Sequence, residues 1–152
     1  MPVVSLDDLP GTGPLIGLDP GSRTVGVAAC DALRLIASPV ETVPRGKKAS
    51  PTLNRILDIC REKSAVGLVI GLPLNMSGEE GPRAQSARAL ARNLLKLSDM
   101  PITFQDERLT SAEAERAMIE ADLSRARRAE LIDASAAALI LQTAIDRLAN
   151  SL

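Results

Sequence analysis

A short apolar segment between two helical patterns places the strongest constraint on the fold of this chain. Residues 66–70 are continuously apolar, without the alternation expected of a strand that has one face in water. Residues 50–63 before this segment and residues 82–97 after it have apolar side chains at helical spacing. A continuous apolar strand between helices is typical of a parallel strand that is covered on both faces. The pattern predicts an α/β protein.

Short strands are predicted in the first third of the chain. Residues 15–18 and 24–29 form two predicted strands joined by a tight turn, and residues 33–43 form a third one that Pro39 interrupts. Strands with such short connections are antiparallel neighbours. Residues 44–49 are expected to be an exposed basic loop.

Helices and strands alternate in the remainder of the chain. Ser50 is expected to cap a helix whose first residue is Pro51. Residues 102–105 are predicted to add a fifth strand, residues 110–113 form a capping box that begins the next helix, and residues 130–148 form the last helix. The expected architecture is a five-stranded mixed sheet, with three antiparallel strands followed by parallel ones and helices on both faces.

Residues 1–14 are rich in proline and glycine, and they carry Asp7 and Asp8 where a signal peptide would have a basic region. We expect them to be a flexible lead-in without regular structure, and residues 15–150 to form a single domain. The sequence also contains no run of about 18 apolar residues. These features predict a cytoplasmic protein that does not associate with membranes.

The composition excludes several kinds of functional site. The chain contains no histidine, which rules out Ser-His-Asp triads, Cys-His pairs and zinc sites that use histidine. Its two cysteines, Cys30 and Cys60, stand far apart and form no metal-binding pattern. Phe104 is the single aromatic residue, so base stacking on aromatic side chains is excluded. Any acid–base or metal chemistry must therefore depend on carboxylates.

Three carboxylates are candidates for such chemistry. Asp19 and Glu107 each follow a predicted strand, where ligands of open α/β sheets bind, and Asp133 lies in the apolar last helix. Three converging carboxylates repel one another unless a divalent cation lies among them, and hard oxygen ligands select Mg²⁺ or Mn²⁺. Structural roles remain alternatives: a turn cap for Asp19, a favourable helix-dipole contact for Glu107, and a helix N-cap for Asp133.

Four motifs in this order resemble the YqgF/RuvX family of bacterial RNase H-like nucleases: GLDPGSRTVGVA (17–28), VIGLPLNMSG (69–78), DERLTS (106–111) and IDASAAALILQ (132–142). The resemblance implies an RNase H-like fold, with Asp19, Glu107 and Asp133 as catalytic and metal-binding acids. It also implies dependence on Mg²⁺ and trimming of the 5′ end of the 16S ribosomal RNA precursor. Members of the family are also described as Holliday junction resolvases, by analogy with the RuvC resolvases.

The chain departs from the RuvC pattern at two positions. Those resolvases carry a second aspartate one turn beyond the one in the final helix, where this chain has Ala136. They also take a glutamate from the end of the fourth strand, where this chain has Gly71, Leu72 and Pro73. Three acids hold two metal ions only with help from backbone, water or substrate phosphate.

Several basic and polar residues are candidates for contacts with a phosphate backbone, because such contacts dominate affinity for nucleic acids. Arg23 and Arg108 adjoin two of the acids, and Asn75 lies in the glycine-rich loop 71–81. The other candidates are Arg125, Arg127, Arg128, Lys47 and Lys48. The alternatives are an ion pair for Arg23 and Arg108, a plain loop for Asn75, and solvated surface charge for the others.

The expected partner is therefore structured RNA, or branched DNA as the alternative. The leading hypothesis is a metal-dependent nuclease that acts on structured RNA. Resolution of four-way DNA junctions, which needs a dimer, and non-catalytic RNA binding in ribosome assembly are the alternatives. The sequence leaves open whether the chain is a monomer or a homodimer.

Overall fold

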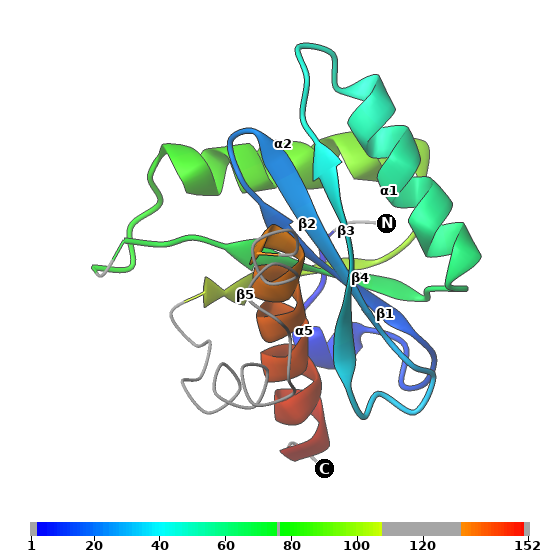
Figure 1. Cartoon of the computed structure of the whole chain (residues 1–152). Coiled ribbons are helices and arrows are strands. Elements are labelled where there is room, and N and C mark those ends of the chain that lie inside the picture. Colours follow the sequence, from blue (N-terminus) through cyan, green and yellow to red (C-terminus); the bar gives the residue numbers. More distant parts are fainter. Residues whose placement is uncertain (1–2, 76, 108–131, 151–152) are drawn as a thin grey trace.

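The computed structural model describes residues 3–75, 77–107 and 132–150 of the 152. Figure 1 shows these residues as a sheet with helices packed on it. The elements are η1 (Leu6–Asp8), β1 (Leu15–Pro20), β2 (Thr24–Cys30), β3 (Ala37–Pro44), α1 (Ser50–Glu62), β4 (Gly67–Leu72), α2 (Pro82–Leu97), β5 (Ile102–Asp106) and α5 (Ile132–Asn150). None of the described helices is long and apolar enough to cross a membrane.

The five strands form one mixed sheet in the order β3-β2-β1-β4-β5. The pairs β1–β2 and β2–β3 are antiparallel, whereas β4 is parallel to both β1 and β5. All six residues of β4 are buried, which explains why the strand is continuously apolar. The predicted five-stranded mixed sheet is confirmed.

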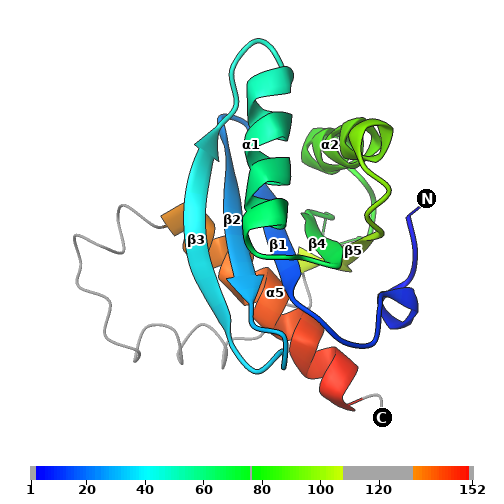
Figure 2. The ribbon, with the colours of Figure 1, turned by 90° about the vertical axis from the view of Figure 1, so that its right-hand side faces the viewer.

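Helices cover both faces of this sheet, as the sequence predicts. Figure 2 shows α1 and α2 on one face and α5 on the other. The helices α1 and α2 bury their apolar stripes against one cluster of strand residues, which includes Ile16, Leu18 and Ile70. The alanine-rich face of α5 packs on the opposite side, over Leu15 and Val69. Because both faces of the sheet are covered, a site for the candidate carboxylates can form only where the strands end.

Gly17 allows α5 to lie directly on β1. A Cβ atom at residue 17 would lie 2.7 Å from Cβ of Leu141 and 2.9 Å from the backbone oxygen of Ala137. Further along α5, Oε1 of Gln142 accepts a hydrogen bond of 2.9 Å from the backbone N–H of Ala37, where β3 begins. The C-terminal part of α5 therefore lies toward the start of β1, and its N-terminal end lies toward the carboxyl end of β1.

Three of the local predictions in the first half of the chain are wrong. The strand predicted for residues 33–43 begins only at Ala37, because Arg34 has a positive φ of 56° and belongs to a turn. Pro39 does not break this strand, since β3 lies at the edge of the sheet and its register shifts opposite Val27 and Ala28. Ser50 does not cap α1 but is its first residue.

The residues before β1 contain regular structure, contrary to the sequence-based expectation. Val3 forms a parallel bridge with Ile102, so this segment continues the sheet beyond β5. Leu9, which directly follows η1, is buried in the cluster under α5. Arg34 donates hydrogen bonds to the backbone oxygens of Pro10 and Gly13. Buried apolar contacts and hydrogen bonds to Arg34 thus attach these residues to the sheet.

Candidate active site

The carboxyl ends of three parallel strands meet at one edge of the sheet. Asp19 lies in the last two residues of β1, and Glu107 directly follows β5. The strand between them, β4, runs parallel to both and ends at Leu72, which pairs with Asp106. In Figure 1, β4 and β5 both end on the left. This is the edge where open α/β sheets bind their ligands.

Gly71 makes room for the side chain of Glu107. A Cβ atom at residue 71 would lie 2.7 Å from Oε1 and 3.3 Å from Cγ of Glu107, and 2.5 Å from Cδ1 of Ile140. Glu107 thus leans from the end of β5 over the backbone of β4. The sequence lacks an acid at the end of β4, and the neighbouring strand supplies a carboxylate over the same position.

Glu107 and Asp19 form an interacting pair of carboxyl groups. Burial raises the pKa of Glu107 to about 7, and the negative charge of Asp19 and a hydrogen bond with Asp19 contribute to the increase. Asp106 raises this pKa further, whereas the positive charge of Arg83 lowers it. Oε1 of Glu107 is buried and has no hydrogen-bond partner. A carboxyl pair of this kind shares a proton or binds a cation.

The donor set at this edge suits a hard divalent cation. Asp19 and Glu107 supply only carboxylate oxygens, and the buried Oε1 of Glu107 lacks a partner. Among the side chains that the structure describes, no group of three His, Cys, Asp or Glu residues is arranged for a metal ion. The pair would therefore need a further ligand from outside those side chains.

Asp133 lies in the first turn of α5, and its side chain is outside the described part of the structure. The backbone nevertheless places this residue at a definite end of the sheet. Ala137, one turn further along, contacts Gly17, and α5 runs in the opposite direction to β1. The four helical residues from Ala137 back to residue 133 cover about 6 Å, close to the roughly 7 Å between Gly17 and Asp19. Residue 133 is thus at the same edge as Asp19 and Glu107.

The structure describes four of the eight candidate phosphate-binding residues from the sequence, Arg23, Asn75, Lys47 and Lys48, and both lysines are exposed. Arg23 is exposed in the turn between β1 and β2, and Asn75 is exposed in the loop that precedes α2. Two backbone hydrogen bonds, with Glu79 and Gly78, close this loop around Asn75. The other four candidates, Arg108, Arg125, Arg127 and Arg128, lie outside the described residues.

Arg83 is a residue that the sequence analysis missed. It lies in the first turn of α2, and its positive charge opposes part of the increase in the pKa of Glu107. A positive charge is unfavourable at a helix N-terminus, where the helix dipole is itself positive. An arginine at that position, with no acidic residue in the first turn, was the signal in the sequence.

The raised pKa of Glu107 predicts how the stability of the metal-free protein depends on pH. The folded state favours the protonated carboxyl, so its stabilising contribution is full below pH 4.5 and is lost as the pH rises through about 7. We expect urea unfolding in the presence of a chelator to show a loss of about 2 kcal/mol between pH 5 and 8. Equal losses in the wild type and in Glu107→Gln would contradict the assignment to this carboxyl.

Comparisons with known proteins agree with the four sequence motifs. A family model described as RuvX, Holliday junction resolvase, matches residues 13–147. Three relatives come from Rhodobacter capsulatus, Paracoccus denitrificans and Bradyrhizobium sp. (strain ORS 278), and each is named "Putative pre-16S rRNA nuclease". They are 58%, 56% and 55% identical to this chain, over 93%, 92% and 91% of its length and 89%, 88% and 86% of theirs.

The fold has a solved counterpart in RuvC. The structure of Thermus thermophilus RuvC in complex with a Holliday junction substrate matches with a TM-score of 0.56 at 14% identity. The match covers 89% of this chain and 96% of RuvC. A second structure of the same RuvC has a TM-score of 0.53. The predicted RNase H-like fold is thereby confirmed, and the chain belongs to the RuvX family, whose descriptions name nucleases, that is, phosphodiester hydrolases.

Proposed function

We propose that this chain is a metal-dependent nuclease that hydrolyses a phosphodiester bond at the 5′ end of the precursor of 16S rRNA. The observation that carries the proposal is the pair of Asp19 and Glu107, with a buried, unpartnered carboxylate oxygen at the carboxyl edge of the sheet. Membership of the RuvX family, whose relatives are named for this substrate, supports the choice of RNA.

Asp19 and Glu107 would hold the cation, and Asp133 is the proposed third ligand. A bound Mg²⁺ or Mn²⁺ would supply an activated water and stabilise the leaving oxygen. The chain itself contributes the position of the carboxylates: β1 fixes Asp19, and Gly71 lets Glu107 lean toward it. Arg83 adds a positive charge close to Glu107. This charge would orient a substrate phosphate and would partly offset the repulsion between the acids.

The proposal is tested by cleavage of a labelled rRNA precursor fragment with Mg²⁺ or Mn²⁺, in the wild type and in Asp133→Asn. We expect cleavage that requires the metal ion and falls at least about 1,000-fold in the variant, because the metal ion that activates the attacking water loses a ligand. RNA binding without cleavage under all metal conditions would contradict a nuclease and favour an RNA-binding assembly factor.

Resolution of four-way DNA junctions is the second candidate, because the fold matches RuvC in complex with a Holliday junction substrate. The same assay with a labelled four-way junction separates the two candidates. Symmetric cleavage of the junction together with a dimer in solution would favour the resolvase. Cleavage of the RNA alone would favour rRNA maturation.

A further inference from the structure

Arg45 joins the loop before α1 to the turn that follows Asp19. Its backbone N–H donates a hydrogen bond of 2.8 Å to the oxygen of Arg23, and its guanidinium Nη1 donates one of 2.6 Å to the oxygen of Gly21. The sequence predicts an exposed loop here, but Arg45 is partly buried. The hydrogen bond of Nη1 holds the guanidinium against the backbone of Gly21, which follows Asp19 by two residues in the sequence.

The charge of Arg45 lacks a carboxylate partner in the part of the chain that the structure describes. Burial lowers the pKa of its guanidinium, which indicates that the charged form loses hydration without gaining an ion pair. A guanidinium has five N–H donors, and only one of them is used by Gly21. A partly buried cation with unused donors is stabilised when an anion binds to it.

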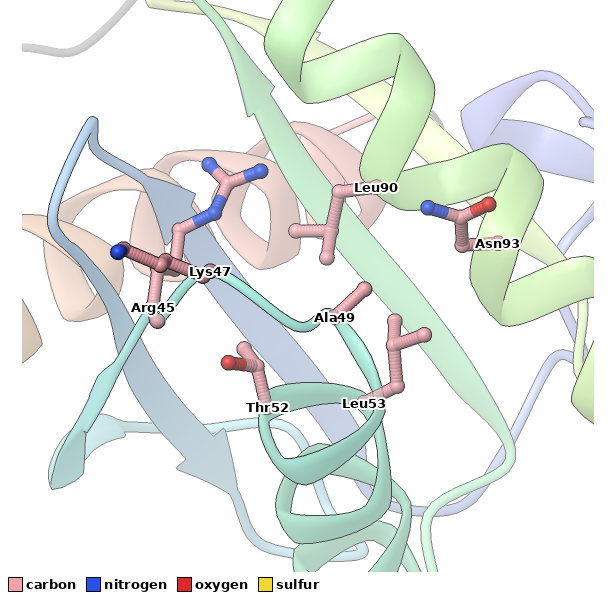
Figure 3. Close-up of a pocket in the computed structure, with 8 residues that line it drawn as sticks. Arg45, Lys47, Ala49, Thr52, Leu53, Leu90 and Asn93 are labelled. Atoms are coloured by element: carbon pink, nitrogen blue, oxygen red, sulfur yellow. The ribbon is translucent and has the colours of Figure 1, made fainter.

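Two further positively charged side chains belong to the same two segments as Arg45 and its hydrogen-bond partners. Lys47 follows in the same loop, and Arg23 lies in the turn to which Arg45 is bonded. Both are exposed, and neither forms an ion pair with a described residue. Figure 3 shows Arg45 and Lys47 on the same side of a cavity of about 120 Å³, with Asn93 of α2 on the other side. The guanidinium of Arg45 points away from Thr52 and Leu53, which line the cavity.

We propose that Arg45, Lys47 and Arg23 form a second phosphate-binding site, which holds the backbone of the substrate next to the bond that is cut. This inference rests on the proposed nuclease function and adds the direction in which the bound nucleic-acid strand extends from the active site. Two extended residues span about 7 Å, which places Gly21 within reach of a phosphate neighbouring the one at Asp19. A forked guanidinium and a mobile ammonium are the groups that proteins use for phosphate oxygens. The site recognises backbone phosphate and does not read bases.

The test measures binding of the labelled rRNA precursor fragment by fluorescence anisotropy, with a chelator present so that no cleavage occurs. We expect Arg45→Gln and Lys47→Gln each to weaken binding about fivefold near 0.1 M salt. Each variant also reduces the slope of log K against log salt by about 0.7 to 0.9, because one phosphate contact is lost. Arg61→Gln is the matched control, since Arg61 pairs with Asp58 near the opposite end of α1.

Lys47→Gln keeps the test independent of folding, because Arg45→Gln also removes the hydrogen bond to Gly21. Unchanged affinity and salt slope in both variants would overturn the phosphate site, even if the wild type cleaves the RNA. A salt-dependent loss of affinity in both variants would support the site, even if the wild type cleaves nothing. Loss of affinity in both variants together with no cleavage by the wild type would reject the nuclease function and keep the phosphate site. Failure of the phosphate site and failure of the nuclease function therefore give different results.

Discussion

Replacement of Glu107 by glutamine is expected to abolish cleavage and, at the same time, to stabilise the metal-free protein. Cleavage should fall at least about 1,000-fold, since a neutral amide is a poor ligand for a hard cation. Stability at pH 8 should rise by about 2 kcal/mol, because the variant removes a buried negative charge; burial and the repulsion with Asp19 together raise the pKa of Glu107 to about 7. Cleavage assays and urea unfolding with a chelator measure the two effects.

The control for this variant is Glu41→Gln. Glu41 of β3 accepts hydrogen bonds from Arg55 of α1. Both side chains of this ion pair are partly exposed. The substitution should leave cleavage unchanged and lower stability by about 0.5 kcal/mol, as for an exposed ion pair. If Glu107→Gln cleaved at the wild-type rate, or lost stability at pH 8, the proposed role of this carboxyl would be wrong.

Replacement of Gly71 by alanine should reduce cleavage about 100-fold with only a modest loss of stability. The new Cβ would lie 2.7 Å from Oε1 of Glu107 and 2.5 Å from Cδ1 of Ile140, so both side chains must move. Both atoms are at the ends of flexible side chains, which limits the cost to about 1 to 2 kcal/mol. A displacement of about 1 Å at a catalytic group is sufficient for a 100-fold loss of rate.

A second substitution separates the two clashes. Adding Ile140→Val to Gly71→Ala removes the atom 2.5 Å from the new Cβ but leaves Glu107 displaced. The double variant should regain part of the stability and none of the activity. Gly11→Ala is the control for glycine replacement, since nothing lies within 4 Å of its Cβ position. Wild-type cleavage by Gly71→Ala would show that the position of Glu107 over β4 is not required.

Patterns of apolar residues made the sheet and the layers predictable. β4 is buried on both faces and is continuously apolar, and α1 and α2 are each buried on one face and have apolar residues at helical spacing. Burial of this kind can be recognised from the order of apolar residues along the chain. The beginning of β3 was not predictable from such patterns, because Leu35 and Ile36 are apolar yet exposed. The residues before β1 were also misjudged, since the burial of Leu9 depends on α5, far away in the sequence.

The candidate acids could be selected from the sequence because each stands at the end of a predicted strand or in an apolar helix; their role as metal ligands stays a prediction. The interaction between Asp19 and Glu107 was not predictable, because it depends on distances between segments that are far apart in the sequence. The lean of Glu107 over Gly71 requires the register of β4 with β5. The hydrogen bond of Arg45 to Gly21 likewise requires β3 to lie beside β2. The sequence therefore identified candidate residues, and the fold determines which of them act together.

The contact of α5 with β1 also determines when a functional site can exist during synthesis of the chain. The backbone N–H of Ala37 bonds to Gln142, 105 residues later, and Gly17 is covered by the same helix. Translation at about 5 to 20 residues per second leaves the early strands without α5 for several seconds or longer. Asp19 and Glu107 are thus synthesised before the helix that carries Asp133. The proposed metal site therefore stays incomplete until α5, with the proposed ligand Asp133, has been synthesised.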